Sequence, residues 1–343
     1  MALKLHGRYC MVVRETLLGA VLWMSLALVG GTSMPAFAEE PAGTFNLLIE
    51  NDVFTGTDQH YTNGLRLSYL SKRDDVPDYI RQFAKAMPFV RPDATLRAGY
   101  ALGHNIYTPN DITSTAPVPN ERPYAGYLYG GFAVVAVSDN ILDTWELDLG
   151  VVGPSALGEE VQNNFHRLIG VEKAQGWANQ LGDEFTLSLT HERKWRHLWP
   201  SPRSGLAMDV TPHIGVGLGN VSSYLSGGVT LRVGEGLVRD FGPPRIRPSL
   251  PGSGFFLDAD GVGWYLFAGV DGRAVFNNIF LDGNTFRDSL GVDKKTWVGD
   301  LQVGLVVTFS KVRLAYAHVF RSKDFVGQPK GDHFGAMSIS ARF

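Results

Sequence analysis

Apolar and polar residues alternate along most of this sequence. In the stretch WELDLGVVG, the side chains of Trp145, Leu147 and Leu149 fall on one face, and acidic side chains fall on the other. A period of two residues is that of a β-strand with one apolar face. The pattern predicts strands at 45–51, 62–71, 96–107, 124–138, 142–152, 184–195, 205–218, 223–234, 261–276, 297–309, 311–321 and 334–343. The predicted fold class is therefore all-β, with twelve strands.

A soluble β-sandwich and a membrane barrel share this alternation, so other features must separate them. The last predicted strand, HFGAMSISARF, is amphipathic and ends on Phe343, which resembles the assembly signal of bacterial outer-membrane barrels. The chain also carries 40 glycines, and an even number of strands is usual for single-chain bacterial barrels. These features favour a 12-stranded antiparallel transmembrane β-barrel whose apolar face meets lipid.

The N-terminus has the pattern of an export signal. A basic start, MALKLHGRYCMVVR, is followed by the apolar stretch LLGAVLWMSLALV and by AFA, which suits a signal peptidase. We therefore expect residues 1–38 to be a signal peptide and residues 39–343 to form the barrel; the apolar stretch is too short for a membrane anchor. Cleavage would remove Cys10, the only cysteine, which excludes thiol chemistry. The net charge of −3 argues against a nucleic-acid partner.

Twelve strands with both termini in the periplasm place the connections after odd-numbered strands outside the cell. The stretch from 153 to 180 is one of these, and it is the one long segment without alternation. A different connection fits poorly: residues 234–261 should be periplasmic, where barrels usually keep short turns. The sequence predicts no role for this long segment.

Residues 153–170 carry the signals of a short helix in that extracellular loop: Pro154 near the start, acidic residues in an early turn, and a terminal glycine. An apolar stripe and a polar stripe then lie side by side. We expect the apolar stripe to pack and the polar stripe to face the sheet or a cleft. The apolar stripe is Val161, Phe165 and Leu168, and the polar stripe is Glu159, Gln162 and His166. A single helical histidine is more often structural than catalytic.

Oxygen-bearing side chains gather at the outer ends of the first two predicted strands. Asn51 and Asp52 end the first strand, and Thr62 begins the second. Such oxygens suit Ca²⁺, and they suit a turn equally well. Strict alternation turns Asn51 outward and both Asp52 and Thr62 inward. One shared site therefore requires a bulge or a strand end that breaks the alternation.

Several blocks of the first half resemble one family, the outer-membrane lipid A 3′-O-deacylases of the LpxR family. The blocks are END at 50–52, YTNG at 61–64, HNIYTP at 104–109, ERPYAG at 121–126, GPSALGEEVQNNFHRLIGVEK at 153–173 and GWANQ at 176–180. The resemblance implies a twelve-stranded barrel with its active site at the extracellular rim, between the wall and a short helix. It also implies Ca²⁺-dependent hydrolysis of the 3′ ester of lipid A, which releases an acyloxyacyl group.

Carried over motif by motif, the resemblance implies roles for six residues. Catalytic positions are His166, Asn51, Glu172 and, as a weaker candidate, Gln162; the Ca²⁺ positions are Asp52 and Thr62. His166 would take a proton from the attacking water, and Glu172 would orient the helix or the imidazole. The expected protein is a monomer in the bacterial outer membrane, acts on lipopolysaccharide, and has an active site that faces the cell exterior.

Two other functions remain open at the level of the sequence. An outer-membrane phospholipase A would cleave glycerophospholipid esters in the same membrane, but such barrels generally use a Ser-His pair. A passive porin or adhesin would use the outer loops only to cover the lumen. The sequence does not indicate which acyl-chain length or which phosphate groups of lipid A the enzyme prefers.

Overall fold

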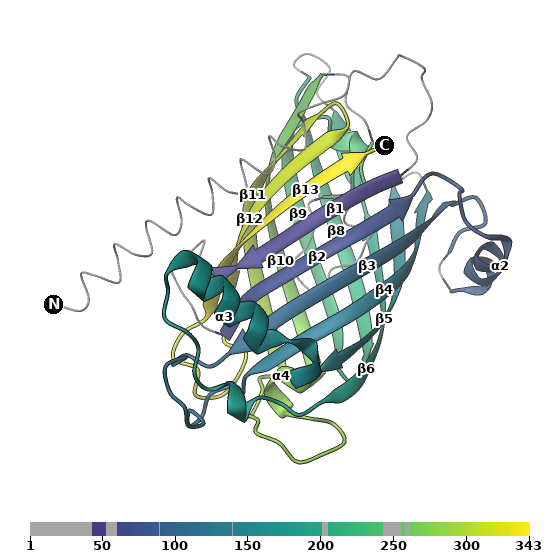
Figure 1. Cartoon of the computed structure of the whole chain (residues 1–343). Helices are drawn as coiled ribbons and strands as arrows, with labels where there is room; N and C mark the ends of the chain where they lie inside the picture. Colours follow the sequence, from purple (N-terminus) through teal and green to yellow (C-terminus); the bar gives the residue numbers. More distant parts are fainter. Residues whose placement is uncertain are drawn as a thin grey trace.

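The computed structural model describes residues 43–52, 60–88, 90–138, 140–200, 205–242, 255–257 and 261–343. These residues form one closed antiparallel β-barrel with tilted strands (Figure 1). Neighbouring strands in the sequence pair with each other, and the last strand closes the ring by pairing with the first. The predicted signal peptide, residues 1–38, lies outside the described residues.

Thirteen strand segments build the described barrel. They are β1 (Gly43–Asn51), β2 (His60–Ser71), β3 (Thr95–Thr108), β4 (Ala125–Ser138), β5 (Ile141–Val152), β6 (Glu184–Trp195), β7 (His197–Pro200), β8 (Ala207–Gly219), β9 (Ser222–Glu235), β10 (Val262–Asn278), β11 (Trp297–Phe309), β12 (Val312–Arg321) and β13 (Asp332–Arg342). Only Arg196 separates β6 from β7, and both pair with β8, so together they form one barrel strand. The twelve-stranded prediction is confirmed. The predicted strand limits differ from the observed ones by at most two residues, except that the sixth barrel strand continues through β7 to Pro200, five residues beyond its predicted end.

Alternation sets the two faces of the barrel as the sequence predicted. On β1, Thr44 and Asn46 are buried in the lumen, whereas Phe45 is exposed on the outside. Leu65 and Leu67 of β2 are likewise exposed. Closure satisfies the backbone groups of every strand, which is what allows an apolar exterior to face lipid.

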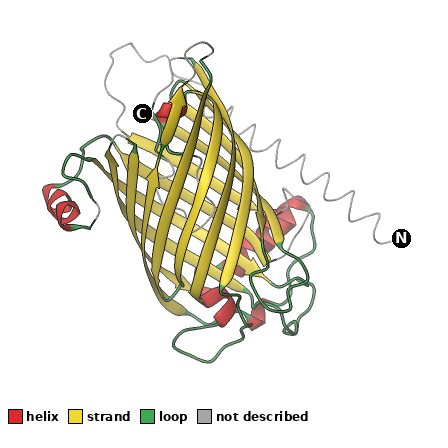
Figure 2. Ribbon diagram, turned by 180° about the vertical axis from the view of Figure 1, so that it is seen from behind, coloured by secondary structure: helices red, strands yellow, loops and turns green. Residues whose placement is uncertain are grey.

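The helices gather at the two ends of the barrel (Figures 1 and 2). We call the end where β1 starts and β13 finishes the terminal end; it carries α2 (Asp78–Ala86) and η4 (Leu237–Arg239). The opposite end, which we call the α3 end, carries η2 (Pro154–Ala156), α3 (Gly158–Ile169), η3 (Trp177–Asn179) and α4 (Ile279–Asp282). Within the described part of the chain, no helix combines the length and the apolar content needed to cross a bilayer.

The connection after β9, for which the sequence predicted no role, folds into the lumen at the terminal end. Asp240 accepts hydrogen bonds from Tyr265 (2.8 Å) and Arg313 (3.1 Å) and also pairs with Arg232. Although burial acts to raise it, the two arginines hold the pKa of Asp240 below its ordinary value. Phe255 packs in the same region against inward-facing residues of β2, β4 and β5. The described parts of this connection therefore fill the barrel, which accounts for a length that a simple turn does not need.

Candidate active site

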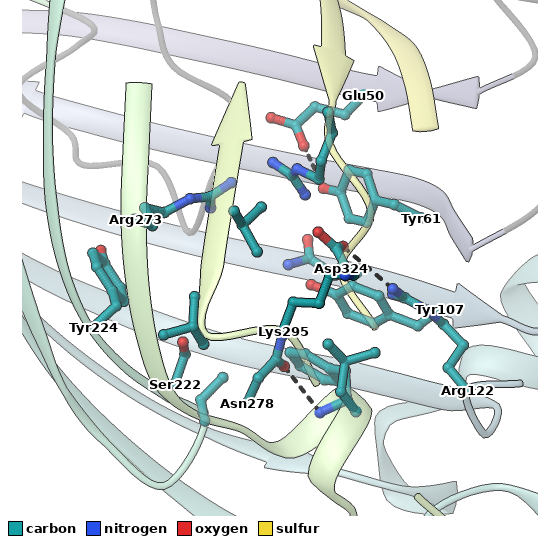
Figure 3. Close-up of a pocket in the computed structure, with 17 residues that line it drawn as sticks. Glu50, Tyr61, Tyr107, Arg122, Ser222, Tyr224, Arg273, Asn278, Lys295 and Asp324 are labelled. Carbon is teal, nitrogen blue, oxygen red and sulfur yellow. Dashed lines mark hydrogen bonds and ion pairs between the residues drawn. The ribbon is translucent and has the colours of Figure 1, made fainter. Parts of the chain in front are cut away.

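The wall formed by β1, β2 and β3 carries different side chains on its two faces at the α3 end. Successive residues of a strand point to opposite faces. Glu50 on β1 and Tyr107 on β3 point into the lumen, where both line a cavity (Figure 3). Their neighbours Asn51 and Thr108 point to the outer face, yet both are buried. A layer of protein therefore covers the outer wall at this end.

A β-bulge in β2 changes the direction of Thr62. The pairing of β2 with β3 shifts at this residue. Tyr61 points into the lumen and donates a hydrogen bond to Glu50, whereas the Thr62 hydroxyl lies 2.8 Å from the hydroxyl of Thr108. The prediction that Thr62 faces inward is wrong, because the bulge inserts an extra residue and breaks the alternation. The bulge instead brings Thr62 to the same face as Asn51.

The connection between β5 and β6 covers this outer face. A Cβ added to Gly126 of β4 would lie 3.0 Å from the Cα of Gly158 at the start of α3. Two glycines thus allow the helix backbone to touch the strand backbone. Beside them, a ring nitrogen of His104 lies 2.7 Å from the carbonyl oxygen of Ala156. These contacts hold the N-terminal end of α3 on the wall, and Figure 1 shows the helix outside the barrel.

Trp177 fills the space between the covering segment and β3. Its ring packs in one buried cluster with Ile106 of β3 and with Tyr124. Its indole nitrogen donates a hydrogen bond of 2.9 Å to Oε1 of Gln162. The side-chain amide of Gln162 is therefore fixed, and within the described residues its buried Nε2 has no hydrogen-bond partner.

The two faces of α3 are arranged differently from the prediction. Gln162 and His166 are buried, as expected for the stripe that faces the sheet, whereas Glu159 of the same stripe is exposed. Val161 and Leu168, which were expected to pack, are exposed, and Leu168 has 82% of its surface accessible. The packing prediction is wrong because α3 lies on the outside of the barrel, where lipid rather than protein meets an apolar face. The helix ends at Gly170 in the left-handed conformation (φ 71°), as the sequence predicted.

A backbone carbonyl group contacts the imidazole of His166. Its Nδ1 lies 2.6 Å from the carbonyl oxygen of Glu172. Since a carbonyl only accepts, the neutral ring carries its proton on Nδ1 and has its lone pair on Nε2. The residue Glu172 itself is exposed. Glu172 therefore contacts the imidazole through its main chain, and the orienting role that the resemblance implies stays a prediction.

Asn51 and Asp52 lie at the very end of β1, and both are buried. Asn51 pairs with Asn63, beside the bulge that carries Thr62. The carboxylate of Asp52 and the amide and hydroxyl oxygens of Asn51 and Thr62 are the kinds of donor that a hard cation such as Ca²⁺ takes. Among the described residues, no group of three His, Cys, Asp or Glu could hold a metal. Any cation here therefore relies on amide, hydroxyl or main-chain oxygens in addition to Asp52.

The structure places Asn51 and Thr62 on the outer face of the wall, and Gln162 and His166 on the helix that packs against this face. Asn51 lies opposite Asn63, the neighbour of Thr62, and Asp52 follows Asn51 directly. Gln162 is tied to β3 through Trp177, and His166 lies one helical turn further along α3. The carboxylate of Glu172 does not take part in any contact described above.

The lumen on the other side of this wall holds a separate polar cavity (Figure 3). Several of its charged groups form ion pairs: Arg122 binds Asp324 at 3.3 Å, and Arg321 binds Asp300, which lies beside the cavity, at 2.9 Å. None of the six predicted site residues lines it. These paired charges stabilise the interior, so the outer face is the better candidate for chemistry.

Sequence reasoning missed four residues that build the site. They are His104, Thr108, Ala156 and Trp177. All four stand in the blocks HNIYTP, GPSALGEEVQNNFHRLIGVEK and GWANQ that carry the family resemblance, where no role was predicted for them. Strand alternation alone could have assigned His104 and Thr108 to the outward face. That assignment indicates a site only when the segment that covers this part of the wall is known.

The comparisons with known proteins agree with this architecture. A family model described as outer membrane protein LpxR matches residues 22–343. The structure is similar to that of LpxR from Salmonella typhimurium, which is 22% identical, with a TM-score of 0.73 over 88% of this chain and 100% of that chain. It is less similar to the β domain of the Bordetella autotransporter BrkA, which is 10% identical, with a TM-score of 0.45 over 89% of this chain and 99% of that chain. No curated protein matches the sequence. Because the family model spans most of the chain, the protein belongs to the LpxR family of outer membrane proteins, and this membership supports a lipid A deacylase in the outer membrane.

Proposed function

We propose that this protein hydrolyses the ester at the 3′ position of lipid A and releases an acyloxyacyl group in the outer leaflet. The observation that carries the proposal is a buried, backbone-anchored His166 on the outer wall of the barrel. A site outside the lumen is reached by a lipid that diffuses within the membrane. With both termini in the periplasm, the α3 end lies at the outer leaflet and the site faces the cell exterior. We expect the barrel to act as a monomer.

His166 acts as the general base in this proposal. Its Nε2 accepts a proton from water while the water oxygen attacks the ester carbonyl carbon. The Glu172 carbonyl, 2.6 Å from Nδ1, stabilises the imidazolium that results. The imidazolium then returns the proton to the sugar oxygen as the carbon–oxygen bond breaks. The products are a carboxylic acid and a sugar with a free hydroxyl, so one water is consumed and His166 is restored.

The negative charge that develops on the carbonyl oxygen needs donors in fixed positions. The Nε2 group of Gln162 is such a donor, because Trp177 holds the other end of the same amide. The amide of Asn51 is a second candidate on the neighbouring strand. Both groups belong to rigid elements, which keeps the cost of reorganisation low.

Asp52, with the help of Asn51 or Thr62, would hold Ca²⁺ in this site. When bound, the ion supplies a Lewis acid that polarises the ester carbonyl. Buried oxygen donors at the end of β1 support this assignment.

The mass spectrum of lipid A tests the proposed function. Cells that express the wild-type chain should lose the 3′ acyloxyacyl group, and cells that express His166→Asn should keep it. The same extracts report on glycerophospholipids, whose cleavage in place of lipid A would favour a phospholipase A. Unchanged lipid A together with ion conductance through the purified barrel would favour a porin.

A further inference from the structure

Helix α2 has one broad apolar arc and a narrow polar arc. It begins after Pro77 with Asp78 in its first turn, where a carboxylate is favoured by the helix dipole. At 100° per residue, Tyr79 and Phe83 lie next to the direction of Ile80 and Ala84 on the helix circumference. Arg81 and Gln82 lie on the opposite side. The apolar arc is therefore wider than a single contact with protein requires.

Half of this apolar arc packs against the outer wall of the barrel. Ile80 and Ala84 are buried in a cluster with Leu96 and Ala98 of β3 and with outward-facing residues of β4. These strand positions continue the parity of Tyr100 and Leu102, which are exposed on the outside. Helix α2 therefore lies beside the barrel and not under its mouth, as Figure 1 also shows.

Within the part of the chain that the structure describes, the other half of the arc has no protein contact of comparable extent. Tyr79 is 73% exposed and Phe83 is 58% exposed. The cluster beneath α2 runs on into Phe132, whose ring lies 5.5 Å from that of Tyr100 on the lipid-facing wall. The two exposed aromatic side chains of α2 are thus continuous with the surface that lipid covers.

We propose that α2 lies in the membrane–water interface at the terminal end, with Tyr79 and Phe83 inserted among the phospholipid acyl chains. The polar arc with Arg81 and Gln82 faces the headgroups and water. Aromatic side chains are enriched at this level of a bilayer, and an amphipathic helix that lies flat there buries its apolar side. With the termini in the periplasm, the leaflet concerned is the inner one. This role does not depend on the enzymatic activity.

Spin labels on α2 test the proposal directly. Phe83→Cys and Gln82→Cys are made in a chain whose native Cys10 is replaced by serine, labelled, and reconstituted in phosphatidylethanolamine–phosphatidylglycerol vesicles. A label at Leu102→Cys provides the reference for a lipid-facing position. We expect the label at 83 to resemble that at 102, with high accessibility to oxygen and low accessibility to a water-soluble nickel complex. The label at 82 should show the reverse.

Two results would overturn the proposal. Equal nickel accessibility at positions 82 and 83 would place the whole helix in water. Spin–spin broadening at 83 that grows with the ratio of protein to lipid would identify a second copy of the chain as the partner. Heat-modifiable migration on gels checks that each labelled variant has folded as a barrel, so that a folding defect is not read as either outcome.

Discussion

The two faces of the wall at the α3 end differ in chemistry although they share the same three strands. On the inner face, Tyr61 donates a hydrogen bond to Glu50, and arginines and aspartates form ion pairs in the same lumen. On the outer face, Asn51 and Thr62 are buried, and α3, which packs on β3 and β4, carries a buried imidazole. Alternation therefore lets adjacent residues serve stability on one side and, in the proposed function, chemistry on the other. Substitutions on the two sides should separate these roles.

The largest effect is expected at His166. His166→Gln removes the general base and should lower the rate of deacylation by at least about a hundredfold, while the barrel still assembles. His197→Gln, at an exposed position at the terminal end, provides the matched control and should keep wild-type activity. Turnover of lipid A in detergent micelles measures both. Wild-type rates for His166→Gln in an assembled barrel would make the imidazole structural.

Asp52 and Glu50 are two nearby acidic residues, of which only Asp52 is proposed to hold the ion. Asp52→Asn should weaken Ca²⁺ binding, measured by calorimetry, and lower activity by at least about tenfold, because even indirect ligand partners cost that much. Glu50→Gln keeps an acceptor for Tyr61 and should leave both quantities near wild type. Equal losses in the two variants would mean that the inner face takes part in the chemistry. Full activity of the wild type in excess chelator would exclude the ion.

A smaller effect is expected where α3 rests on the wall. Gly126→Ala places a methyl group 3.0 Å from Gly158 and should push the helix outward. A shift of about 1 Å in a catalytic group can cost up to a hundredfold, so we expect a loss of about tenfold. Gly130→Ala on the same face of β4 meets no heavy atom closer than 4.0 Å and is the control. If both variants were fully active, the contact between the two glycines would not position the site.

The smallest effect is expected at Glu172. Its side chain is exposed, and the contact to His166 comes from its backbone carbonyl. Glu172→Ala should therefore leave deacylation near the wild-type rate. A Glu172→Pro exchange, which restricts the backbone around that carbonyl, should lower activity more. A large loss in the alanine variant would assign a catalytic role to the carboxylate.

The sequence predicts the barrel well because its signal is local and repeated. Each strand carries its own alternation, and errors in one strand do not affect the next. The helix was predicted with its correct end at Gly170, but its apolar face was assigned to packing. That inference holds for a helix surrounded by water. It fails for α3 because the solvent around the wall is lipid.

The sequence predicts residues for the candidate site, and it predicts only part of the geometry that the structure gives them. The motif blocks point to Asn51, Asp52 and His166. The direction of the Thr62 side chain depends on a bulge that the residue pattern of β2 does not predict. The contact made by the backbone carbonyl of Glu172 does not depend on the residue type at this position, so the sequence does not predict it. Main-chain groups and register shifts are therefore the part of this site that the sequence alone cannot supply.

The pairing of β1 with β13 has a consequence for the order in which this protein matures. Asn51 lies opposite Gly335, so the end of the first strand is held in place by the last one. Until the ring closes, β1 is a free edge, and the end of β1 that carries Asn51 lacks one of its two neighbouring strands. A chain caught partway through insertion would therefore carry all the candidate site residues on an incomplete wall. Under the proposed function, we expect hydrolysis to begin only after closure, so that the membrane is protected from the enzyme during the enzyme's own assembly.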